Sequence, residues 1–114
     1  MAKIIFDRLS RWNAPTWVAR NLAAHLDVFI ALTTTKIRER FSELLAGHAT
    51  VVDLSTASSE EMAELLEAAE FSRQAVKRKS KWGDPASESI FITAFDRFLD
   101  TLRMDRRVAS NTDQ

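Results

Sequence analysis

The chain has 114 residues, in which 16 Lys and Arg residues balance 16 Asp and Glu residues, and it contains no cysteine. This length predicts one domain, and the balanced charge provides no overall field that would attract nucleic acid or an anionic membrane. The lack of cysteine excludes disulfides, thiol nucleophiles and thiolate metal sites.

Valine and isoleucine are concentrated in four short runs, which predict four β-strands. Eight of the twelve Val and Ile residues fall in these runs. β-branched side chains lose little rotamer freedom on a pleated sheet and more in a helix, so this clustering is typical of strands. The predicted strands are residues 3–6, 28–33, 49–54 and 89–94.

Helical periodicity predicts four helices, at residues 15–25, 35–46, 58–80 and 96–107. Asn13 and Pro15 indicate the start of the first helix. Gly47 is expected to end the second helix in a left-handed conformation. Ser58 and Glu61 have the spacing of a capping box at the start of the third. Residues 110–114 are expected to form a disordered tail after a globular domain of residues 1–109.

The alternation of strands and helices predicts a small α/β domain with a doubly wound parallel sheet of about four strands. An all-α bundle of three or four helices is the alternative, because residues 15–46 also fit one long helix and residues 91–102 fit a helical stripe. Two glycines are few for an α/β protein. However, a helix over residues 15–46 would be unusually long and would carry three threonines at its middle.

Taken in order, these segments resemble the receiver domain of bacterial response regulators. KIIFD at residues 3–7 is similar to a first strand ending in acid, FSELLAGHATVVD at 41–53 to the second helix and third strand, and IFITA at 90–94 to the fourth strand. The resemblance implies Asp53 as phosphoacceptor, Asp7 and Asp53 as Mg²⁺ ligands, and Thr93 as the switch residue. Arg8 stands where a second acid is common, which favours a pseudo-receiver that binds a partner over an enzyme.

Independently of the resemblance, polar side chains follow each predicted strand. The carboxyl ends of parallel strands share one edge of a sheet, so we expect Asp7, Thr33, Asp53, Ser55 and Thr93 to converge there. Two close carboxylates favour a divalent cation. The same residue types also cap helices routinely, and that interpretation remains open.

Aromatic residues are the main candidates for binding a partner protein. Tryptophans at the ends of elements often anchor partners, although they also cover small cores. The last helix is a further candidate surface, including one for a homodimer. The candidates are Trp12, Trp17, Trp82, Phe95 and Phe98.

One basic cluster provides candidates for contacting nucleic acid: Arg73, Lys77, Arg78, Lys79 and Lys81. Cations at the C-terminus of a helix also complement the helix dipole, and this interpretation is favoured. We therefore expect a protein partner rather than a nucleic-acid partner.

The sequence thus predicts a small regulatory module that acts by binding a protein. An all-helical adaptor or homo-oligomeric assembly protein is the alternative, and a nucleic-acid-binding regulator is the third possibility. The apolar stretches are far shorter than the roughly 20 residues that span a bilayer. The first residues lack the pattern of a signal peptide, so we expect a cytoplasmic protein without a membrane partner.

Overall fold

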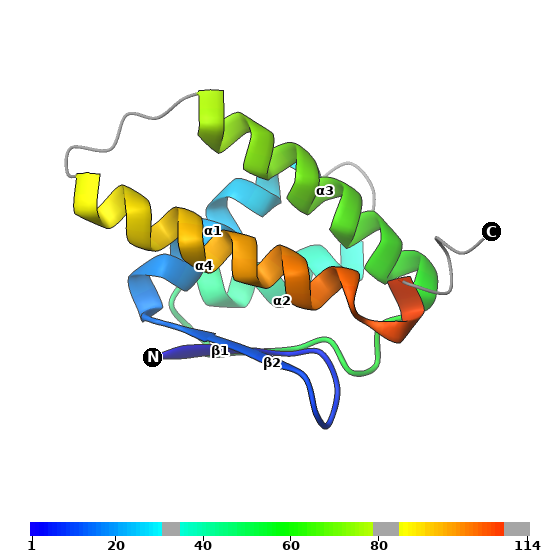
Figure 1. The fold of residues 1–114 in the computed structure, drawn as a ribbon. Helices are drawn as coiled ribbons and strands as arrows, with labels where there is room; N and C mark the ends of the chain where they lie inside the picture. Colours follow the sequence, from blue (N-terminus) through cyan, green and yellow to red (C-terminus); the bar gives the residue numbers. More distant parts are fainter. Residues whose placement is uncertain (31–34, 79–84, 109–114) are drawn as a thin grey trace.

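The computed structural model describes residues 1–30, 35–78 and 85–108. In this part of the chain, four helices lie on one side of a small three-stranded sheet (Figure 1). The elements in order are β1 (Ala2–Ile5), β2 (Arg11–Ala14), α1 (Thr16–Ile30), α2 (Thr35–Leu45), β3 (Val51–Asp53), α3 (Ser59–Arg78) and α4 (Pro85–Arg103).

The sheet is mixed, with the strand order β2-β1-β3. β1 pairs antiparallel with β2 in a hairpin and parallel with β3, and Ile4 lies opposite both Trp12 and Val52. These three side chains are buried toward the helices. Because side chains alternate across a strand, the neighbouring residues form the other face, which the described helices leave uncovered.

The prediction of four parallel strands is wrong. Residues 28–30 form the end of α1, and residues 90–92 lie within α4; residues 31–33 lie outside the described residues. β2 was not predicted at all. The doubly wound, receiver-like layout is therefore replaced by a mainly helical layer on a small mixed sheet. The all-α alternative is also wrong, because of the sheet and because α1 and α2 are two helices packed against each other.

The aromatic residues of α4 explain why residues 90–92 are helical. Phe91, Phe95, Phe98 and Leu102 recur at helical spacing, and all four are at most 1% exposed. Burial of one such side chain contributes about 1.5–3 kcal/mol, whereas β propensities span only about 1 kcal/mol. The tertiary packing of one helical face therefore outweighs the local preference of Ile90 and Ile92 for a strand.

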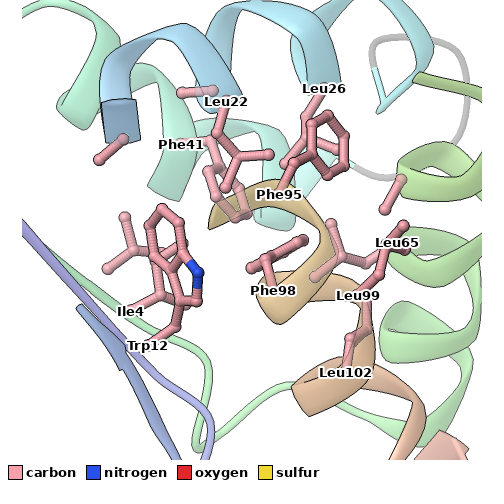
Figure 2. Packing of buried hydrophobic residues seen from close by; sticks show 14 of the residues in the cluster. Ile4, Trp12, Leu22, Leu26, Phe41, Leu65, Phe95, Phe98, Leu99 and Leu102 are labelled. Carbon is pink, nitrogen blue, oxygen red and sulfur yellow. The ribbon is translucent and has the colours of Figure 1, made fainter. Parts of the chain in front are cut away.

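The hydrophobic core lies between the sheet and the helices, with Phe98 near its centre (Figure 2). Trp12 reaches from β2 to α4, where its Nε1 donates a hydrogen bond to the carbonyl of Ala94 at 2.9 Å. Its ring meets that of Phe98 edge-on at 5.7 Å between centroids. This contact ties the hairpin to the last helix.

Two predicted helix ends are confirmed. Gly47 has φ +80° just after α2, in the left-handed conformation expected of it. Ser58 precedes α3, where its Oγ accepts a hydrogen bond from the backbone N–H of Glu61 at 3.1 Å. The Glu61 carboxylate accepts one from the backbone N–H of Ser58 at 3.4 Å. Both ends are local features, which explains why the sequence alone predicts them.

Candidate functional site

The parallel pairing of β1 with β3 brings two predicted site residues to the same edge of the sheet. Ile5 lies opposite Asp53 in the register, and Asp7 follows directly after β1. The predicted hydroxyl groups do not all join them. Thr93 is exposed on α4, so the strand position that suggested a switch role does not exist, and Thr33 lies outside the described residues.

Each of the two carboxylates caps the loop that follows it. Asp7 Oδ1 accepts hydrogen bonds from the backbone N–H groups of Leu9 at 2.7 Å and Ser10 at 2.8 Å, and these bonds are the main reason that the pKa of Asp7 is lowered. Asp53 Oδ1 accepts the backbone N–H of Ser55 at 2.9 Å. The side-chain hydrogen bond with Ser55, followed by the backbone bond, lowers the pKa of Asp53.

A third charged group, which the sequence interpretation missed, occupies this edge of the sheet. The Arg107 guanidinium donates to the carbonyls of Leu54 at 2.7 Å, Ala57 at 2.8 Å and Phe6 at 2.9 Å. It also pairs with the buried carboxylate of Asp105 at 2.8 Å, and this hydrogen bonding is the main reason that the pKa of Arg107 is raised. We call Arg107 and Asp105 the arginine clasp, because they join three segments distant in sequence.

The positive charge of Arg107 in the arginine clasp disfavours the binding of Mg²⁺ at this edge of the sheet. A guanidinium already fills the space between the loops after β1 and β3, and its charge acts on Asp7. Asp7 Oδ1 is already used by two backbone N–H groups. Within the described residues, no group of three or more His, Asp or Glu side chains is placed to hold a metal ion.

Beside the arginine clasp, the hairpin loop and the segment directly after α4 form an open surface with two exposed apolar side chains. Leu9 is 94% exposed and Met104 is 82% exposed. They border a hollow of about 420 Å³. We call this area the hairpin-tip surface, and its residues are Asp7, Arg8, Leu9, Ser10, Met104 and Arg106.

The hairpin-tip surface carries more positive than negative charge. Arg8 and Arg106 are exposed, and no ion pair of either is found among the described residues. Asp7 is the one acid among the lining residues. The sequence signal that points here is slight: an apolar residue stands in a polar loop, between Arg8 and Ser10.

Most of the predicted aromatic anchors are not on the surface. Trp12, Phe95 and Phe98 are at most 3% exposed and belong to the core, because they are needed to cover the junction of the sheet with α4. Trp17 is 40% exposed at the start of α1 and stays a candidate. Trp82 lies outside the described residues.

The predicted basic cluster is described only in part. Arg73 is largely buried and forms an ion pair with Asp96 at 2.7 Å, which joins α3 to α4. Lys77 and Arg78 end α3, while Lys79 and Lys81 lie outside the described residues. The nucleic-acid prediction for this cluster therefore stays a prediction.

Two other hollows lie among the described residues. One of about 390 Å³ runs along α3, and its lining includes Leu66, Val108 and Phe71, which is 51% exposed. The other lies at the edge of β3. There Arg40 donates hydrogen bonds to the carbonyl of Asp53 and, at 2.9 Å, to the hydroxyl of Thr56, so that its side chain covers the strand edge.

Among the described helices, none combines the length and the apolar character that crossing a membrane requires. No protein-family model matches the chain, and no curated protein matches it. Among solved structures, it is similar to a chain of "CdiA-CT toxin from Burkholderia pseudomallei E479 in complex with cognate CdiI immunity protein". The TM-score is 0.72 at 13% identity, over 95% of this chain and 99% of that chain. The likeness is one of fold, and it provides no support for a receiver domain.

Proposed function

We propose that this protein is a protein-binding module that works as one member of a two-protein complex, of the kind that a toxin forms with its immunity protein. The observation that carries the proposal is the hairpin-tip surface, where the exposed side chains of Leu9 and Met104 border one hollow. Covering an exposed Leu or Met side chain contributes about 1.5–3 kcal/mol. Clustered apolar side chains of this kind are typical of binding sites.

The fold comparison supports the same function. The similar chain belongs to a complex of a toxin with an immunity protein, and each member of such a complex binds a protein. The likeness covers nearly the whole of both chains, so the same scaffold is available here for the same kind of association.

The hairpin-tip surface is also held rigidly, which favours binding. Asp7 fixes the hairpin loop by two hydrogen bonds, and Arg107 holds both the loop and the segment after α4. Because these hydrogen bonds already hold the backbone of the loop, less backbone entropy is lost there on association. Receiver-like regulation loses its basis, since two of the strands on which it depended are helical.

The proposal is tested by isolating the tagged protein from its native host and measuring the mass of the purified species by light scattering. We expect a complex with one partner protein in fixed stoichiometry. The paired substitution Leu9→Asp and Met104→Asp should abolish the complex while the circular dichroism spectrum stays unchanged.

Ile90→Asp is the matched control, because Ile90 is 51% exposed near the start of α4, whereas Met104 follows directly after the end of that helix. This variant should retain the partner. A monomer without any stoichiometric partner contradicts the proposed function, and so does a homodimer. Equal loss of the complex in the paired variant and in Ile90→Asp would contradict the assignment of the surface.

A further inference from the structure

We propose that the partner presents acidic side chains around a small apolar group, and that this apolar group packs against Leu9 and Met104. This inference rests on the proposed function and specifies the chemistry of the partner. It is drawn from the juxtaposition of two exposed apolar side chains with Arg8 and Arg106 around one hollow.

The charges of the hairpin-tip surface favour an acidic partner. Arg8 and Arg106 have no carboxylate partner among the described residues, so their charges are available to another molecule. Arg107 and Arg106 act electrostatically on Asp7 and help to lower its pKa, which indicates a positive local potential. Asp7 keeps its negative charge, but Arg8 and Arg106 outnumber this one acid in the lining, so an approaching carboxylate is attracted on balance.

The apolar centre of the surface favours a protein over a nucleic acid. Single-stranded nucleic acids are bound by cations together with aromatic side chains, on which bases stack. The centre of the hairpin-tip surface instead holds a leucine and a methionine, and its lining residues include no aromatic side chain. Aliphatic side chains of this kind pack against apolar side chains of a protein partner.

A second copy of this chain is a poor occupant for the same surface. A two-fold dimer would place the same patch of each copy against the other. Two copies of the same arginine-rich area would then be brought together, and like charges in contact oppose association. The partner is therefore a different protein with complementary charge.

The chemistry is tested with three synthetic peptides that share a central Leu-Phe pair, flanked by Asp and Glu, by Ser and Gln, or by Lys. Binding to the full chain is followed by ¹H–¹⁵N NMR. We expect the acidic peptide to shift the signals of Arg8, Leu9, Ser10 and Arg106. Its affinity should exceed that of the neutral peptide by about tenfold or more at about 50 mM salt, and the difference should shrink at about 500 mM.

Charge reversal supplies the second arm of the test. Arg8→Glu with Arg106→Glu should remove the preference for the acidic peptide and favour the basic one. Arg38→Glu, an exposed arginine of α2 that pairs with Asp27, makes the same kind of change elsewhere and should leave the preference intact. Equal binding of all three peptides, no binding of any, or tighter binding of a short single-stranded RNA at this surface overturns the inference.

The two proposals fail in different ways. If the native complex forms and depends on Leu9 and Met104 but ignores salt and the charge reversal, then only the acidic partner is excluded. If no complex forms in the native host, the protein-binding function itself fails.

Discussion

Removal of the Arg107 side chain is expected to destabilise the fold more than any other single arginine change among the described residues. In Arg107→Ala, the carbonyls of Phe6, Leu54 and Ala57 lose their donor, and the buried carboxylate of Asp105 loses its partner. Breaking a buried ion pair by removing one partner costs about 3–5 kcal/mol. The Arg107 side chain is 20% exposed, so water replaces part of the loss and we expect about 2–4 kcal/mol.

The loss is measured by urea unfolding followed by circular dichroism, together with the thermal midpoint. For a chain of this size, roughly 4 °C is lost per kcal/mol, so Tm should fall by about 8–15 °C. Arg107→Lys keeps one charge but not the planar fork, and it should fall between the wild type and Arg107→Ala.

Arg106→Ala is the matched control, since the neighbouring arginine is exposed and makes no described ion pair. Its stability should stay within about 0.5 kcal/mol of the wild type. A loss below about 1 kcal/mol in Arg107→Ala would refute the argument that the arginine clasp holds the three segments together.

Three further predictions concern Asp7, Gly47 and the core residue Phe98. The pKa of Asp7 lies below its unfolded value because of the hydrogen bonds from Leu9 and Ser10. Its contribution to stability is therefore complete above about pH 4 and is lost as the pH falls through the lowered pKa. In Asp7→Asn, the free energy of unfolding should therefore fall less steeply than in the wild type between about pH 5 and about pH 2. Gly47→Ala should cost about 1–2 kcal/mol in urea unfolding through its positive φ alone, since the nearest atom to an added Cβ is 3.9 Å away. Phe98→Ala should cost about 3–5 kcal/mol by the same measurement, and an unchanged midpoint would contradict its central place in the core.

Part of the candidate site was predictable from the sequence. β1 and β3 are short apolar runs, and their pairing brings Asp7 and Asp53 to one edge, as the strand-end argument predicts. The other interpretation that the sequence left open was capping of the following helices. The structure corrects it: Asp7 accepts N–H groups of the β1–β2 hairpin loop, and Asp53 accepts that of Ser55, four residues before α3 begins.

The arginine clasp could not be predicted, because its partners are distant in the chain. Arg107 is 101 residues from Phe6 and 53 from Leu54, and no local pattern marks a residue that bonds to backbone carbonyls. Helix-end arginines are usually explained by the helix dipole. The protruding Leu9 and Met104 were missed for a related reason, since exposure depends on which surfaces the remaining elements leave uncovered.

The sequence by itself determined the local features of this protein: two strands, the end of α2 at Gly47 and the capping box at Ser58. These depend on the backbone and side chains of residues within a few positions. Tertiary structure decided between the strand and the helical stripe that residues 90–92 both fit, and it alone decided that β2 pairs with β1 and that Trp12 is buried against α4. The physical reason is that local propensities differ by about 1 kcal/mol or less, whereas burial of a helical face contributes several times more.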